Sequence, residues 1–431
     1  MFTTFRNAWK IADLRKKLLF TLLILFIYRI GNRIPVPGVD VAALRTFFDQ
    51  TLSTTVLGFY NTLSGSAFSE ATVLALSIQP YINASIIIQL LTIAVPALER
   101  MAKEEGEVGK KKLTRITRYT TVGLGLLMGV AYTVMLHNYN ILASDANFLS
   151  YVVIVLSFTA GSALVMWLGE QITEFGIGNG ISIILFANII SRIPDNIISL
   201  VTNLSTGAMK WWGATIVLVG VAALVLLIVF INDAERRIPI QYAKRVVGRK
   251  VYGGQNTNLP IKVNMSGVMP VIFAQSIAAL PATIFAFTNP NGTSGNGFVQ
   301  FLINMFDSSS WFYAFLYFIL IIAFAYFYAA VQYDPVEIAN NLKKNGGFIP
   351  GFRPGNPTAA FIQKVLNKVT LFGAVYLGIV AILPLIIGKI VNVAALSIGG
   401  TSVIIVVGVA LETVQALESQ MLMRQYKGFL E

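Results

Sequence analysis

The sequence contains no cysteine, and this absence excludes disulfide bonds, iron–sulfur clusters and thiol catalysis for this chain. His137 is the only histidine, and a metal site would need further ligands that are not nearby in the sequence. Charged residues make up 12% of the 431 residues, whereas an ordinary soluble protein has about a quarter. Hydrophobic residues make up 55%. We therefore expect no metal or cofactor, and lipid rather than water as the main solvent.

Ten apolar runs are long enough to cross a membrane, since a bilayer core about 30 Å thick needs roughly 20 residues per helical span. The runs are 18–34, 76–96, 117–137, 150–169, 181–201, 212–232, 268–288, 311–330, 370–390 and 399–416. No small-residue cleavage site follows the first run, so we interpret it as a retained span rather than a signal peptide. The pattern predicts an all-α integral membrane protein with ten transmembrane helices.

The net charge of +12 could indicate nucleic-acid binding, but its distribution favours membrane topology. If the N-terminus is inside, 26 of the 32 basic residues fall in the leader, the inner loops and the tail. Such a bias is typical of cytoplasmic loops. We expect a multi-pass protein with both termini in the cytoplasm.

Ten spans divide naturally after the fifth, into residues 1–205 and 206–431. Because each half has an odd number of spans, the halves would insert in opposite orientations, as inverted repeats do. Pro80 aligns with Pro270 when "SIQPYINASI" is set against "GVMPVIFAQS". Proline begins or bends a helix, and freed backbone groups at membrane depth must be covered by protein or water. Two interpretations of the second and seventh spans follow. Either they face the interior of the protein, or they are ordinary kinked helices that pack against their neighbours.

Two inner loops are longer than connection requires. Residues 233–266 alternate basic residues with Ile, Tyr and Val around glycine-rich turns, which predicts a hairpin-like finger. Residues 333–369 contain "GGFIPGFRPGNP", in which glycine and proline enforce a turn-rich shape. Either these loops carry charge only for topology and lipid headgroups, or they form a docking surface for a large anionic partner.

Ionisable side chains are nearly absent from the middle of the runs. Placing an ionisable side chain in the bilayer costs free energy, so such side chains in membrane-embedded enzymes and ion-coupled pumps usually belong to the functional site. Arg29 and Arg33 lie toward the outer end of the first run, where they can snorkel, and Glu170 and Glu174 flank the inner end of the fourth. The sequence therefore argues against a buried carboxylate relay and against an enzyme.

The motif "GIGNG" at 176–180 superficially resembles a phosphate-binding glycine loop, but two membrane spans flank it instead of a βαβ unit. A turn that lets the two spans pack closely is the better interpretation. The polar residues within spans are uncharged, and their hydrogen bonds would each be worth only about 0.6 to 2 kcal/mol. They are Gln79, Asn83, Ser85, Gln89, Asn188, Gln275 and Ser276. Bonds of that strength suit a seam that opens.

Several segments together resemble the SecY family of bacterial protein-conducting channels. They are "MWLGEQITEFGIGNGISI" at 166–183, "RRIPIQYAKRVVGRKVYGGQ" at 236–255, "GGFIPGFRPG" at 346–355 and "GGTSVIIVVGVALET" at 399–413. The likeness runs along the chain in unchanged order. It implies two inverted five-helix halves around a central hourglass pore, in the cytoplasmic membrane of a bacterium.

The resemblance also implies an apolar constriction in the pore, made of Ile78, Ile82, Ile181, Leu185, Ile272 and Ile405. Narrow apolar constrictions oppose ions and water by dewetting. Taken singly, each of these residues could equally be a core or lipid-facing side chain. A lateral gate is implied between spans two and three and spans seven and eight, with Ser85, Gln89, Gln275 and Ser276 along it.

In the family, a half-helix before the second span plugs the outer funnel, and here it corresponds to about 61–75. Candidate plug residues are Ser64, Gly65, Ser66, Phe68 and Glu70. A re-entrant segment is allowed at that depth if protein covers it. Family members commonly have glycine and methionine where this chain has Ser77 and Gln79.

The two inner loops resemble the family's docking surfaces. The candidate partner-binding residues are Arg236, Arg237, Lys244, Arg245, Arg249, Lys250 and Arg353. The implied partners are SecE, SecG, the motor ATPase SecA, the ribosome, secretory preproteins, nascent membrane proteins and the lipid bilayer. Basic side chains could also meet ribosomal RNA phosphates without reading sequence.

We therefore expect a passive channel that passes unfolded polypeptides and releases hydrophobic segments sideways into lipid, driven by a partner. The alternative is an inverted-repeat small-solute transporter with broken helices. That transporter would need convergent polar groups at the midplane, where the residues assigned to the constriction are apolar.

Overall fold

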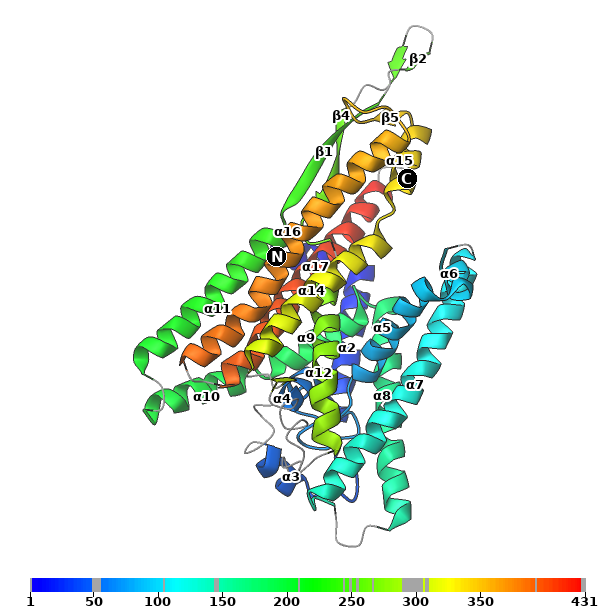
Figure 1. Cartoon of the computed structure of the whole chain (residues 1–431). Helices are drawn as coiled ribbons and strands as arrows, with labels where there is room; N and C mark the ends of the chain where they lie inside the picture. Colours follow the sequence, from blue (N-terminus) through cyan, green and yellow to red (C-terminus); the bar gives the residue numbers. More distant parts are fainter. Residues whose placement is uncertain are drawn as a thin grey trace.

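The computed structural model describes residues 2–48, 56–103, 105–142, 147–207, 210–242, 245–247, 250–252, 256–265, 267–288, 305–306, 310–391 and 394–427. Helices dominate it (Figure 1). Those of the first half are α1 (Phe2–Lys10), α2 (Ala12–Gly31), α3 (Val41–Phe47), α4 (Val56–Ser64), α5 (Gln79–Ala94), α6 (Pro96–Lys103), α7 (Gly106–Asn138), α8 (Phe148–Phe175), α9 (Gly180–Ser191) and α10 (Ile193–Ser205). Those of the second half are α11 (Trp211–Asn232), α12 (Met269–Thr288), α14 (Trp311–Gln332), α15 (Pro335–Lys344), α16 (Asn356–Val391) and α17 (Ala394–Lys427).

Within the described residues, 7 stretches are long and apolar enough to cross a membrane: Gly106–Asn138, Phe148–Phe175, Gly180–Ser205, Trp211–Asn232, Trp311–Lys344, Asn356–Ile387 and Thr401–Met423. An eighth candidate is the pair α5 and α6, bent by 105° where Pro96 starts a new helix. Helices α2 and α12 coincide with the two remaining apolar runs of the sequence. The expected helical membrane fold is confirmed.

Pro80 and Pro270 both lie in the first turn of their helices, α5 and α12. Proline fits there because the first turn leaves its backbone N–H groups unbonded in any case. The sequence had left open a break within the second span. The structure instead begins the helix at Gln79, so Pro80 sets where the regular span starts.

The membrane helices pack side by side, and a narrow sheet projects from one end of the bundle (Figure 1). Helix α1, at the N-terminal end of the chain, lies against α17, where the Thr4 hydroxyl donates a hydrogen bond of 3.0 Å to Glu418. The largest apolar cluster draws on both halves, with α2, α5, α8 and α9 contributing alongside α12, α14, α16 and α17. The two halves therefore share one core along the centre of the molecule.

The predicted finger is confirmed as a hairpin. Strand β1 (Glu235–Tyr242) pairs antiparallel with β4 (Asn256–Lys262), and the short strands β2 (Arg245–Val247) and β3 (Lys250–Tyr252) pair beyond them. The structure adds a link that the sequence did not indicate: β5 (Gly347–Phe348), from the second long loop, pairs with the other edge of β1. Both loops also share a small apolar core that includes Ile240, Leu342 and Ile362, so they form one unit.

The glycine motif at 176–180 forms the expected tight turn between α8 and α9. Gly178 has a φ of +69°, in the left-handed region that favours glycine. A Cβ on Gly180 would lie 1.9 Å from the carbonyl oxygen of Gly169, so the two spans touch there backbone to backbone. The Asn179 carboxamide oxygen then accepts the backbone N–H of Ile181 at 3.0 Å and caps α9.

A similar close approach lies between α8 and the chain leading into α5. A Cβ on Gly161 would lie 1.8 Å from the carbonyl oxygen of Val73. We therefore predict that Gly161→Ala displaces this segment and destabilises the protein by about 1–3 kcal/mol, the usual range for overpacking. Thermal unfolding of the purified protein in detergent measures the effect.

The control for this substitution is Gly123→Ala on α7, because a Cβ on Gly123 meets nothing within 4 Å. Alanine there gains helix propensity of about 1 kcal/mol, so the control should be neutral or stabilising. Equal behaviour of the two variants would contradict the close approach at Gly161.

Candidate functional site

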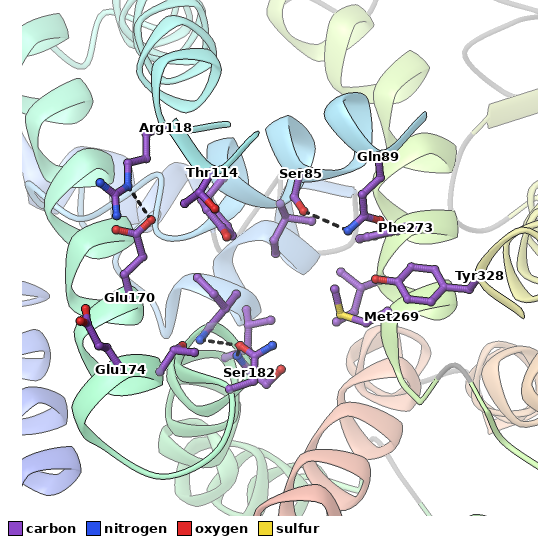
Figure 2. A pocket seen from close by; sticks show the side chains of 17 residues that line it. Ser85, Gln89, Thr114, Arg118, Glu170, Glu174, Ser182, Met269, Phe273 and Tyr328 are labelled. Carbon is purple, nitrogen blue, oxygen red and sulfur yellow. Dashed lines mark hydrogen bonds and ion pairs between the residues drawn. The ribbon is translucent and has the colours of Figure 1, made fainter. Parts of the chain in front are cut away.

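A cavity of about 430 Å³ opens within the bundle (Figure 2). Its upper walls are polar: Arg118 on α7 pairs with Glu170 on α8 at 2.9 Å, and Glu174 lies one turn further along α8. Ser85 and Gln89 line it from α5, and Tyr328 lines it from α14. Glu170 and Glu174 lie near the C-terminal end of α8, where the sequence predicted that they flank the fourth span, and Arg118 of α7 joins them.

Part of the lining is apolar, and we refer to this part as the cavity floor. It includes Ile82, Ile181, Leu185 and Ile272, four of the six residues assigned to the constriction. Ile78 and Ile405 lie in the same apolar cluster, each 1% exposed. The structure therefore brings all six residues together from α5, α9, α12, α17 and the turn before α5, although they span more than three hundred positions in the sequence.

The residues assigned to the lateral gate fall into two groups. Ser85 and Gln89 are one helical turn apart on α5, with the Gln89 amide donating to the Ser85 hydroxyl at 3.5 Å, and Figure 2 shows Gln89 pointing toward Phe273 of α12 and Tyr328 of α14. Gln275 instead donates to the Tyr313 hydroxyl of its own half at 3.4 Å, and Ser276 is buried. Only the first group lines the cavity.

The plug segment, residues 61–75, differs in shape from the expected half-helix. Helix α4 ends at Ser64, and turns occupy the chain from there to α5. Gly65, Ser66, Ala71 and Ser77 all have positive φ, which an α-helix of L-residues does not accommodate. The expectation that the half-helix runs to Ala75 is wrong; the segment is a compact coil of turns.

This coil packs against both apolar clusters. Leu63 and Leu74 belong to the cluster that holds the constriction residues, while Phe68 and Ala71 belong to a second cluster with Tyr132 of α7. The rings of Phe68 and Tyr132 stack with centroids 4.4 Å apart. The plug segment therefore shares one apolar cluster with the residues assigned to the constriction and packs through Phe68 against Tyr132 of α7.

Two polar side chains donate to backbone carbonyls near the beginning of the plug segment. The Asn188 amide of α9 donates to the Leu63 carbonyl at 2.7 Å, to the Tyr28 hydroxyl at 2.8 Å and to the Ser77 hydroxyl at 3.4 Å. Asn32 donates to the Ser64 carbonyl at 3.1 Å. These bonds satisfy carbonyls that the end of α4 would otherwise leave unpaired at membrane depth.

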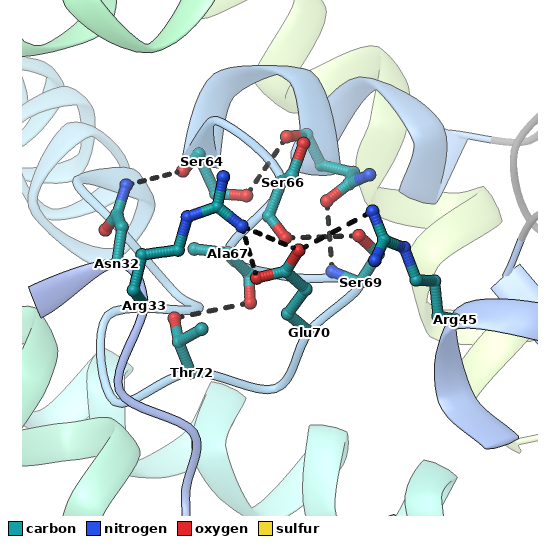
Figure 3. A network of polar contacts seen from close by, with 10 residues as sticks. Asn32, Arg33, Arg45, Ser64, Ser66, Ala67, Ser69, Glu70 and Thr72 are labelled. Carbon is teal, nitrogen blue, oxygen red and sulfur yellow. Dashed lines mark hydrogen bonds and ion pairs between the residues drawn. The ribbon is translucent and has the colours of Figure 1, made fainter. Parts of the chain in front are cut away.

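Glu70 carries an ionic contact on the outer side of the plug segment (Figure 3). Its carboxylate lies 3.2 Å from Arg33, which follows α2, and 3.9 Å from Arg45 of α3, and its side chain is 13% exposed. The sequence had suggested that Arg33 snorkels to the headgroups. The structure pairs it with Glu70 instead, so two arginines fasten the plug segment to the outer loop.

Sequence reasoning singled out Asn188 as a polar residue in a span but missed its partner Tyr28. Tyr28 is fully buried on α2, within the apolar run that begins at residue 18. A tyrosine hydroxyl deep in an apolar span was the signal available, since such a group needs a hydrogen-bond partner.

The candidate partner-binding residues lie on the projecting unit. Arg236 and Arg237 are exposed on β1, and Arg353 is exposed in the turn after β5. The backbone of Arg245 and Lys250 lies in β2 and β3. Lys244 and Arg249 lie outside the described residues.

The chain matches the family model described as SecY over residues 72–414. A protein translocase subunit SecY of Streptomyces scabiei is 44% identical over 441 residues, with 100% of both chains covered. The subunit of that description from Thermotoga maritima is 42% identical over 439 residues, covering 100% of this chain and 98% of the relative.

Among solved structures, the fold resembles one described as "The structure of a protein conducting channel", with a TM-score of 0.66, 18% identity and coverage of 95% of this chain and 93% of the other. It also resembles Sec61 in a canine ribosome–channel complex from the endoplasmic reticulum, with a TM-score of 0.64, 17% identity and the same coverage. At these identities the likeness concerns the fold.

We predict that Asn188→Leu loosens the plug segment. The substitution removes three hydrogen bonds and leaves the Leu63 carbonyl buried without its donor, at a cost of about 1–3 kcal/mol. The chain lacks cysteine, so a single Thr72→Cys reports on the segment: Thr72 is 1% exposed, and a thiol reagent reaches it only when the segment moves. Labelling should accelerate at least severalfold in Asn188→Leu, whereas Asn196→Leu on the exposed face of α10 should leave the rate unchanged.

We further predict that Glu70→Gln accelerates the same labelling by no more than about fivefold, because partly exposed ion pairs contribute about 0.2–1 kcal/mol. Salt should discriminate this contact from a packing effect. Raising the ionic strength should accelerate labelling in the unsubstituted plug segment and have a smaller effect in Glu70→Gln. The control is Glu107→Gln, which should respond to salt as the unsubstituted protein does. If salt accelerated labelling equally in the unsubstituted protein and in Glu70→Gln, or equally in Glu107→Gln and in Glu70→Gln, the ionic contact would be ruled out.

Proposed function

The chain belongs to the SecY family, and we propose that it is a passive, gated protein-conducting channel of a bacterial cytoplasmic membrane. An unfolded polypeptide enters the cavity of Figure 2 from the cytoplasmic side, passes the constriction and leaves through the outer mouth. The observation that carries this proposal is that apolar residues lining the cavity belong to the same buried cluster as Leu63 and Leu74 of the plug segment.

The apolar side chains of the constriction exclude water and ions, and because they are aliphatic they can move aside for a passing polypeptide. Water and ions leave a narrow apolar neck because it offers them no hydrogen bonds. Isoleucine and leucine side chains contact a passing chain only by dispersion, so they fit any sequence without binding one tightly. Ile82 and Ile272 come from opposite halves and both line the cavity, so separating the halves would widen the neck.

The plug segment closes the outer side of this neck. It is held by hydrogen bonds from Asn32, Asn188 and Tyr132, by backbone bonds to residues 34 and 36 and by the Glu70 ion pair. Hydrogen bonds of this kind contribute only about 0.5–1.5 kcal/mol each. A segment so held stays in place at rest and leaves when a translocating chain competes for the space.

Hydrophobic segments leave sideways between α5 and α7 on one side and α12 and α14 on the other. Gln89 and Tyr328 stand at this seam on the cavity side (Figure 2). Moving an apolar segment from the cavity to lipid lowers its free energy by about 25 cal/mol per Å² of apolar surface removed from water. Segments of high hydropathy therefore leave through this seam, and polar segments stay in the pore.

Translocation takes its energy from partners. We propose SecA and the ribosome as the drivers, with SecE and SecG as companion subunits and with both termini of this chain in the cytoplasm. Arg236, Arg237 and Arg353 lie exposed on the projecting unit, where positive charge suits acidic protein surfaces or ribosomal RNA phosphates. The pairing of β5 with β1 joins the two long loops. A partner that binds one loop would therefore move the other with it.

A photo-crosslinker at Ile82 tests the proposal. With an arrested secretory precursor and an active motor in membranes, we expect an adduct at Ile82, because the precursor must pass the cavity floor. The control position is Leu226 on α11, which is 72% exposed on the outside of the bundle and should give none. Absence of an adduct at Ile82 in translocating membranes would refute the channel route.

A further inference from the structure

A second, much smaller cavity lies between the plug segment and the helices α4, α5 and α7. It encloses about 10 Å³ and is lined by Leu57, Tyr60, Phe68, Ala75, Leu76, Gln79 and Met128. A space of about 10–15 Å³ is what one water molecule requires. The cavity therefore matches the smallest space that holds one water.

The lining is apolar except for the Gln79 carboxamide and the Tyr60 hydroxyl. Gln79 is 3% exposed, and neither its side-chain oxygen nor its side-chain nitrogen has a hydrogen-bond partner among the described residues. Buried amides without any partner are rare in proteins, because each unsatisfied group retains its full desolvation cost. Gln79 is the first residue of α5 and precedes Pro80.

The polar residue two positions earlier behaves differently. The Ser77 hydroxyl is within hydrogen-bond distance of Tyr28, at 3.2 Å, and of Asn188, at 3.4 Å. The Ser77 hydroxyl thus has side-chain partners, while the Gln79 carboxamide lines a small cavity and has none among the described residues.

We propose that this cavity is a hydration site in which one water binds the Gln79 carboxamide. A water has the donors and acceptors to bond to both amide atoms, and it fits the space where a protein group does not. The site is built by the plug segment, because Phe68 and Ala75 supply part of its wall.

This site has a consequence for gating, which rests on the proposed function. When the plug segment leaves, the cavity loses a wall and Gln79 meets solvent, where all its hydrogen bonds can form. When the segment is seated, one water supplies only some of them. Gln79 therefore favours departure of the plug segment relative to an apolar side chain of similar size, and it sets how readily this channel opens.

The experiment uses the complete membrane complex carrying the buried Thr72→Cys reporter. We expect Gln79→Leu and Gln79→Met each to slow labelling of that cysteine about tenfold, which corresponds to about 1.4 kcal/mol in the seating equilibrium. The matched control Gln363→Leu, at an exposed position of α16, should leave the rate unchanged. A reporter at the exposed Thr206→Cys should be labelled at one rate in all of these proteins.

A cryo-EM map that resolves ordered waters gives the second readout. We expect one water within hydrogen-bond distance of the Gln79 carboxamide, and no water there in Gln79→Leu. A protein group on both amide atoms, a dry cavity, or unchanged labelling in both Gln79 variants would overturn the proposal. Neither readout requires precursor transport, so a complex that fails to crosslink precursor at Ile82 but holds this water would refute the proposed function and leave the hydration site standing.

Discussion

The structure depends on one constraint, which is that backbone polar groups at membrane depth must be paired within the protein. The spans meet it by being helices. The plug segment does not, because its positive φ angles exclude a helix beyond Ser64. Its carbonyls are instead paired by side chains from other elements, with Asn188 serving Leu63 and Asn32 serving Ser64. A non-helical stopper is possible in this bundle because the neighbouring spans supply those donors.

The same arrangement explains why polar and apolar residues alternate so closely around the start of α5. Ile78 and Ile82 face the constriction cluster, Ser77 joins the tyrosine and asparagine pair, and Gln79 faces the small cavity behind the plug segment. Three adjacent positions thus serve three different surroundings. A turn followed by a helix start makes this possible, because neither has the strict periodicity of a long helix.

Much of the architecture was accessible from residue patterns. Each of the ten apolar runs coincides with a helix or helix pair, and the alternating loop at 233–266 forms a hairpin, because hydropathy and periodicity are local properties. The likeness to a known family identified Ile82 and Ile405 as members of one constriction, and both lie in the same apolar cluster. The prediction of a half-helix up to Ala75 was wrong. Non-glycine residues such as Ser66 and Ala71 adopt the left-handed backbone conformation there, which no local sequence pattern indicates.

By itself, the sequence determined that this protein is a multi-pass membrane protein built of apolar helices, because this follows from the cost of placing long apolar segments in water. Only the tertiary structure decided which polar groups find partners. Asn188 reaches Tyr28 across 160 positions, Glu70 reaches Arg33, and Gln79 reaches no protein group among the described residues. The reason is physical: a hydrogen bond requires a specific distance and direction between two atoms, and these are fixed by packing rather than by the order of residues.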